Sequence, residues 1–78
     1  MSTIQTTTDL MLACQTLEAE AELVSSKEAH GAWWDKKVAL LHMVNGAFET
    51  GYFTGDAYSE LSEAKSALYR GERKAGRY

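Results

Sequence analysis

The chain has 78 residues, a formal net charge of −3 at pH 7, 45% hydrophobic residues and no proline. A chain of this length forms one domain and buries only about 60% of its unfolded surface, so we expect its core to need a partner or a second copy. A single cysteine, Cys14, excludes an intramolecular disulfide, and His30 and His42 do not complete a zinc motif with it.

The charged residues are divided unevenly along the chain. Residues 1–30 carry five acidic residues against one lysine, whereas residues 65–78 carry five basic residues against one glutamate. This asymmetry predicts an acidic body with a basic C-terminal tail. The first residues show no basic region and no apolar run, and no stretch approaches the roughly 20 apolar residues that span a bilayer. We therefore expect a cytoplasmic protein with no membrane segment.

The first predicted helix runs from about Thr8 to about Ala29, after a segment, residues 1–7, that we expect to be flexible. Thr7 or Thr8 would cap it, and Asp9 would lie in its first turn. Its main apolar stripe has helical spacing and consists of Leu10, Ala13, Cys14, Leu17, Ala21 and Val24. A thinner stripe on the opposite side consists of Leu12, Ala19 and Leu23. This second stripe is either ordinary exposed apolar surface or a contact surface for another protein.

The second predicted helix covers about residues 32–50 and holds both tryptophans. Gly31 is expected to end the first helix and Gly51 the second. Large apolar side chains cover about 220° of the second helix, which is wider than a surface helix needs, so we expect it to be the central helix. Adjacent Trp33 and Trp34 point about 100° apart, so one can enter the core while the other covers a flank.

The third predicted helix follows an aromatic connection, Tyr52 and Phe53, and runs from about Asp56 to Arg70. Thr54 or Asp56 would cap its start, and Gly71 would end it. Its core stripe is narrow and consists of Ala57, Leu61, Ala64 and Leu68, beside a shoulder of Tyr58, Ser62, Lys65 and Tyr69. Residues 72–78 are expected to trail flexibly, and the basic tail consists of Arg70, Arg73, Lys74 and Arg77. The sequence thus predicts one all-α domain over residues 1–78, a small three-helix bundle.

No set of residues forms a catalytic motif. Cys14 lies on the main apolar stripe, where a cysteine is usually a small buried hydrophobe. His42 lies on the polar side of the second helix, and His30 lies near a predicted helix end, where a cation suits the helix dipole. The sequence contains no zinc-protease motif, calcium loop or phosphate-binding glycine loop. We expect no enzymatic activity, no metal and no cofactor.

The surplus apolar surface favours binding to another protein, because tryptophan and tyrosine are frequent interface anchors. The predicted interface consists of Leu12, Ala19, Leu23, Trp33, Trp34, Tyr52, Phe53, Tyr58 and Tyr69. We expect a helical interaction module that sterically occupies a larger partner as an inhibitor or adaptor.

In size and composition the chain resembles accessory proteins of phages and mobile elements. One target class would be a host nucleic-acid enzyme or defence complex, because the basic grooves of such proteins are natural partners for acidic faces. Two alternatives stay open. One is a nucleic-acid-associated accessory protein that uses the basic tail for salt-sensitive phosphate contacts. The other is a self-associating structural protein, for instance a homodimer.

Overall fold

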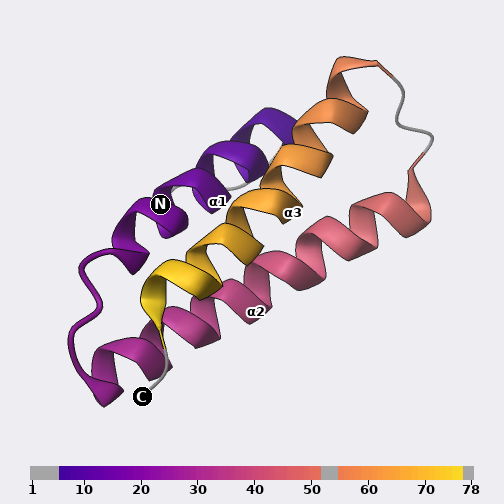
Figure 1. Cartoon of the computed structure of the whole chain (residues 1–78). Helices are drawn as coiled ribbons and strands as arrows, with labels where there is room; N and C mark the ends of the chain where they lie inside the picture. The colour runs from indigo at the N-terminus through magenta and orange to yellow at the C-terminus, as the bar shows by residue number, and fades with distance from the viewer. Residues whose placement is uncertain (1–5, 52–54, 77–78) are drawn as a thin grey trace.

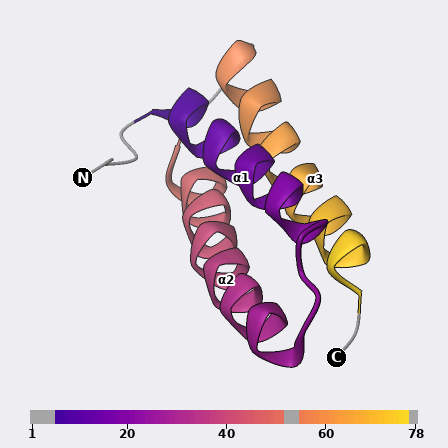
Figure 2. The ribbon, with the colours of Figure 1, turned by 90° about the vertical axis from the view of Figure 1, so that its left-hand side faces the viewer.

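The computed structural model describes residues 6–51 and 55–76. It consists of three helices, α1 (Thr7–Ala21), α2 (Lys27–Thr50) and α3 (Asp56–Ala75). They pack as the predicted all-α bundle, in which α1 and α3 run in the same direction and α2 runs in the opposite direction (Figures 1 and 2). Within the described residues no helix is long and apolar enough to cross a membrane.

The turn between α1 and α2 comes earlier than the sequence predicted. α1 ends at Ala21 rather than near Ala29, and α2 begins at Lys27, so that Gly31 lies inside α2 instead of ending α1. The reason is the side chain of Ser26, which accepts a hydrogen bond from the Ala29 N–H at 3.1 Å. A serine cap satisfies a free donor in the first turn of a helix, and this local bond starts the new helix before the glycine.

The start of α1 also lies slightly earlier than predicted. Thr6, rather than Thr7 or Thr8, caps α1, and its hydroxyl accepts a hydrogen bond from the Asp9 N–H at 3.1 Å. Thr7 is therefore helical, and the flexibility predicted for residues 1–5 falls outside the described residues. At its other end, α2 stops at Thr50, as predicted, but Gly51 is the C-cap with an extended backbone rather than a left-handed C′ residue.

The C-terminal end of α3 contradicts the predicted flexible tail. α3 does not stop at Gly71 but continues to Ala75, so residues 72–75 are helical. Gly71 does not end the helix but lies against Trp33: a Cβ at this position would lie 2.6 Å from Cζ2 of the indole. The glycine allows the indole to lie directly against the backbone of α3. At the start of α3, Asp56 is the first helical residue rather than the cap.

The core is built around the contact between α1 and α3, which pack more closely than either packs against α2. A Cβ at Gly71 would lie 3.4 Å from Cα of Glu18, so the two backbones nearly touch there. Small side chains on α3 make this approach possible. The buried apolar residues are Leu10, Cys14, Leu17, Ala21, Trp33, Val44, Leu61, Ala64, Ala67, Leu68 and Ala75. The core is thus centred on the contact between α1 and α3, and α2, which covers the helix predicted over 32–50, packs less closely against each of them.

The wide apolar arc of α2 is only partly covered by its neighbours. Trp33 and Val44 are buried, and the Trp33 indole N–H donates to the carbonyl of Leu17 at 2.8 Å. Leu40, Leu41, Ala47 and Phe48 are half-buried. Met43 is 49% exposed and Trp34 is 39% exposed. The surplus apolar surface predicted for this helix therefore persists in the folded chain.

Candidate protein-binding site

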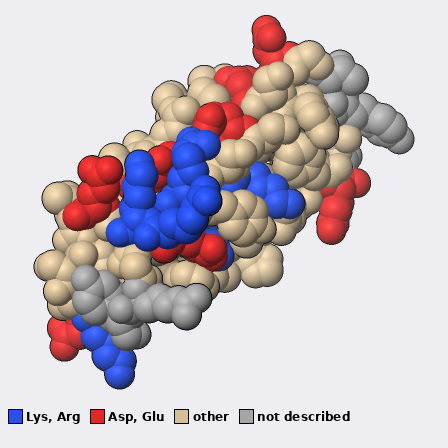
Figure 3. Space-filling view, in the orientation of Figure 1, with Lys and Arg blue, Asp and Glu red and all other residues tan. Residues whose placement is uncertain are grey.

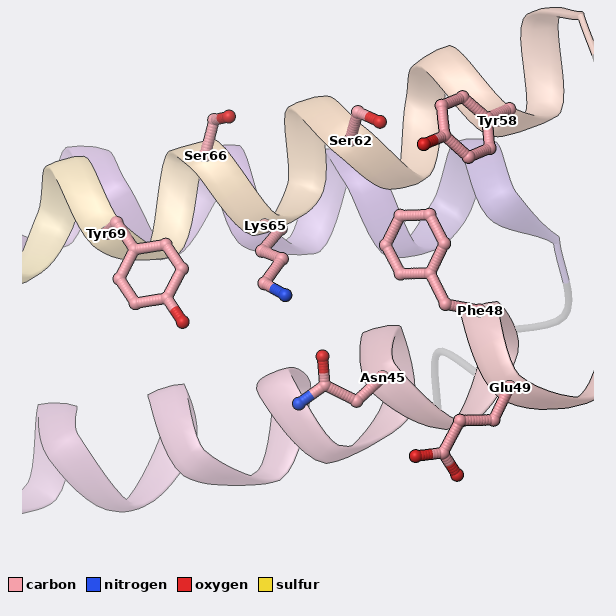
Figure 4. Close-up of a pocket in the computed structure, with 8 residues that line it drawn as sticks. All are labelled: Asn45, Phe48, Glu49, Tyr58, Ser62, Lys65, Ser66 and Tyr69. Carbon is pink, nitrogen blue, oxygen red and sulfur yellow. The ribbon is translucent and has the colours of Figure 1, made fainter.

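A groove runs along the surface between α2 and α3. Its volume is about 520 Å³, and it is lined by Asn45, Phe48, Glu49, Tyr58, Ser62, Lys65, Ser66 and Tyr69. Figure 4 shows Asn45 and Phe48 of α2 and Lys65 and Tyr69 of α3 reaching into the gap between the two helices, whereas Ser62 and Ser66 point away from α2. We call it the aromatic groove.

One wall of the aromatic groove is the predicted shoulder of α3. Its members recur at steps of three or four residues, so they lie on one side of the helix beside the core stripe. Across the gap, the Phe48 ring meets the Tyr58 ring edge-on, with ring centroids 5.6 Å apart. Tyr58 is 54% exposed and Tyr69 is 43% exposed. These tyrosine rings are thus partly packed against the protein and partly exposed to solvent.

The aromatic surface continues past Tyr69 through Lys37, a residue that was not predicted to belong to the site. The Lys37 Nζ lies 4.4 Å from the centre of the Trp34 ring and 5.8 Å from that of Tyr69. Lys37 is only 6% exposed and forms an ion pair with Glu72. The sequence feature that could have identified Lys37 is its spacing: it follows Trp33 by four residues and so lies on the same, buried side of the helix. Because cation–π contacts hold both rings, Lys37 fixes their positions at this end of the groove.

Trp34 is also held from its other side. Its ring stacks on that of His30 with centroids 5.7 Å apart, and His30 Nε2 lies 3.0 Å from the carbonyl oxygen of Gly76. This stacking and this hydrogen bond therefore connect the start of α2 to the end of α3. We call these two helix ends, with Trp34 and His30, the rim of the groove.

The polar centre of the aromatic groove is Lys65. Figure 4 shows its ammonium group in the gap between the helices, with the Asn45 amide pointing toward it. The Glu49 carboxylate points away from α3. Within the described residues Lys65 forms no ion pair, although it is half-buried. A half-buried cation without a counter-charge is a ready partner for an anionic group.

The predicted basic tail is mostly used inside the fold. The Arg70 guanidinium donates to Glu18 at 3.1 Å and also bonds Glu63, while the Lys74 ammonium donates to Glu18 at 2.7 Å and lies 3.6 Å from Glu22. The hydrogen bonds from Arg70, and then from Lys74, lower the pKa of Glu18. These pairs join α1 to α3, so the two cations are largely neutralised.

The other two residues of the predicted basic tail are Arg73 and Arg77. Arg73 is exposed and forms no ion pair with a described residue, whereas Arg77 lies outside the described residues. Figure 3 shows lysine and arginine atoms gathered over the C-terminal half of α3, with carboxylates around them. The patch is therefore mixed in charge rather than uniformly basic.

The structure divides the predicted interface residues among three places. Trp34, Tyr58 and Tyr69 lie along the aromatic groove and its rim, whereas Trp33 is in the core. Of the second stripe predicted for the first helix, Leu12 and Ala19 lie exposed on α1, with Leu12 51% exposed. Leu23 is 79% exposed but lies in the turn after α1, because the helix ends at Ala21. Tyr52 and Phe53 lie outside the described residues.

A second groove lies between α1 and α2, next to the α1 stripe. It has a volume of about 480 Å³ and is lined by Ala13, Thr16, Leu17, Glu20, Lys36, Ala39 and Leu40. Lys36 and Glu20 form an ion pair there at 3.8 Å. Its walls combine aliphatic, hydroxyl and charged side chains and carry no aromatic ring, so this groove offers weaker anchors than the aromatic groove.

The described residues contain neither a reactive cysteine nor a group of metal ligands. Cys14 is fully buried, and burial raises the pKa of its thiol to about 11, which disfavours the nucleophilic thiolate. No group of three or more His, Cys, Asp or Glu residues in the described part of the chain could hold a metal ion. Comparison with models of protein families, with curated proteins and with solved structures finds no significant match to this chain.

Proposed function

We propose that this chain is a non-enzymatic protein-interaction module that docks on a larger partner through the aromatic groove. The observation that carries the proposal is a set of three partly exposed rings on α2 and α3: Tyr58 and Tyr69 line the groove, and Trp34 and Tyr69 both contact Lys37. Exposed tyrosine and tryptophan with restricted side-chain motion are the residue types that dominate binding energy at protein interfaces.

The mode of action in this proposal is steric. A chain of 78 residues covers a partner's surface as an inhibitor or bridges two surfaces as an adaptor. A cytoplasmic location and an origin as a phage or mobile-element accessory protein are further parts of the proposal, based on the sequence. A host nucleic-acid enzyme or defence complex is the target class we would examine first.

Site-specific photo-crosslinking tests this proposal. A photo-reactive phenylalanine analogue replaces Tyr58 or Tyr69 in the full chain, and a matched variant carries it at Leu12 on the outer side of α1. In cells that naturally encode the chain, we expect Tyr58 and Tyr69 to give the same adduct to a larger protein and Leu12 to give none. Adducts from Leu12 alone would place the interface elsewhere and refute the aromatic groove.

Self-association is the second candidate function, because α2 leaves apolar side chains such as Met43 and Trp34 exposed. Sedimentation of the purified chain over a hundredfold range of concentration distinguishes self-association from binding to a different protein. A monomer throughout the range supports a foreign partner. A reversible dimer that Tyr69→Ala weakens would mean that the groove binds a second copy.

A further inference from the structure

The charges beside the aromatic groove determine which partner would fit it. Most carboxylates of α3 are already engaged: Glu60 accepts hydrogen bonds from Thr7 and Thr8, Glu63 pairs with Arg70, and Glu72 pairs with Lys37. On the cationic side, Lys65 and Arg73 form no ion pair with any described residue. The α3 side therefore carries two cations without an ion pair to a described residue, Lys65 in the groove wall and Arg73 beyond it. The carboxylate of Glu49, which lines the α2 wall and also forms no ion pair with a described residue, points away from α3 (Figure 4).

These two cations are regularly placed. Lys65, Tyr69 and Arg73 follow one another at four-residue spacing on α3, so a cation, a ring and a second cation lie along one side of the helix. The rise of an α-helix puts about 12 Å between the first and the last of them. Asn45 lies across the groove from Lys65 (Figure 4). The complementary surface is a pair of anions about 12 Å apart with an apolar side chain between them.

We propose that the aromatic groove binds an acidic amphipathic helix of the partner protein, with two carboxylates about seven residues apart and a leucine or similar side chain between them. Residues seven apart lie on the same side of a helix and about 10.5 Å apart, which long side chains extend to Lys65 and Arg73. This inference rests on the proposed function and specifies the chemistry of the partner.

A nucleic acid fits these observations less well. A phosphate backbone binds through many cations, and each neutralised phosphate adds to affinity and to its salt dependence. Arg70 and Lys74, which would extend the basic stripe, are held by Glu18 and partly neutralised by it. Two remaining cations match two carboxylates better than they match a continuous chain of phosphates.

The experiment uses two synthetic helical peptides of about 18 residues, long enough for five turns. One carries two glutamates seven positions apart with leucines between them, and the other has glutamine at both positions. Each is titrated into the isotope-labelled full chain, and amide shifts are followed by NMR. We expect the glutamate peptide to shift amides of Asn45 and residues 58–69, and the glutamine peptide to bind at least about fivefold more weakly, as for a lost charge-assisted contact.

Three charge variants test the contacts directly. Lys65→Gln and Arg73→Gln should each lower the affinity of the chain for the glutamate peptide by about three- to tenfold. Raising the salt concentration should also lower the affinity of the unmodified chain for this peptide. Lys27→Gln, an exposed charge at the start of α2, is the matched control and should leave the affinity unchanged.

Each other outcome overturns the acidic-helix inference. Equal binding of the two peptides in the groove would remove the charge preference and leave the proposed function standing. If neither peptide shifts groove amides, or if a single-stranded oligonucleotide of about 20 nucleotides binds Lys65 and Arg73 more tightly, the acidic helix is wrong. Photo-crosslinking at Tyr58 and Tyr69 is independent of these results, so failure of the partner chemistry and failure of the interface can be told apart.

Discussion

At the scale of single residues, the most constrained position in the chain is Gly71. A Cβ there would lie 2.6 Å from Trp33 Cζ2, and the indole cannot move away easily because it is buried and its N–H bonds the Leu17 carbonyl. We expect Gly71→Ala to lower the free energy of unfolding by about 1–3 kcal/mol, the usual cost of overpacking.

The matched control for this substitution is Gly31→Ala. Gly31 also lies inside a helix, but no atom lies within 4 Å of a Cβ built there. This variant should raise the free energy of unfolding by up to about 1 kcal/mol, because alanine is the better helix former. Urea unfolding measures both variants. If Gly71→Ala proved as stable as Gly31→Ala, the close packing of Trp33 on α3 would be wrong.

The second prediction at residue scale concerns Cys14. With its pKa at about 11, only about one thiol in a thousand is ionised at pH 8, and the side chain is fully buried. We expect the native chain to react with a thiol reagent orders of magnitude more slowly than the chain in urea. Absorbance of the released chromophore follows the reaction. A native rate close to the unfolded rate would contradict the buried position of Cys14.

At the scale of secondary-structure elements, the ion pairs of Glu18 join α1 to α3. Hydrogen bonds from Arg70 and Lys74 lower the pKa of Glu18 below its ordinary value of 4.5. The folded chain therefore binds this proton less readily than the unfolded chain. The stabilisation is complete above the ordinary carboxyl pKa and is lost as the pH falls through the lowered folded pKa.

We therefore expect Glu18→Gln to lower the melting temperature by several degrees at neutral pH, and this deficit to shrink as the pH falls from about 6 to about 3. Glu20→Gln is the control, because Glu20 forms one exposed ion pair at 3.8 Å, which contributes little. Thermal unfolding by circular dichroism at several pH values gives the comparison. A deficit that stays constant down to pH 3 would argue against a stabilising charge on Glu18.

The helices themselves were largely predictable from the sequence, whereas their ends were not. Apolar spacing identified the buried stripes on α1 and α3, including Cys14 and Leu68, because side-chain periodicity is a local property. Helix ends depend on competing caps, so the Ser26 cap displaced the expected end near Gly31. Gly71 was read as a helix end because nothing local to the sequence shows that Trp33 packs against it.

At the scale of the whole molecule, only one of the two walls of the aromatic groove could be predicted from the sequence. The shoulder of Tyr58, Ser62, Lys65 and Tyr69 was correctly placed beside the core stripe of α3. Its opposite wall, with Asn45 and Phe48, depends on how α2 lies along α3, which single-helix periodicity does not specify. The engagement of Arg70 and Lys74 by α1 carboxylates likewise requires the tertiary arrangement.

The most direct test of the whole account compares two double variants for affinity to the partner captured by crosslinking. Tyr58→Ala with Tyr69→Ala removes two rings from the aromatic groove, and Leu12→Ala with Leu23→Ala removes the exposed apolar residues near α1. Circular dichroism checks that both variants fold. By calorimetry we expect the tyrosine variant to lose at least about tenfold in affinity and the leucine variant to change by less than about threefold. The reverse result would mean that the protein binds its partner through α1 and not through the aromatic groove.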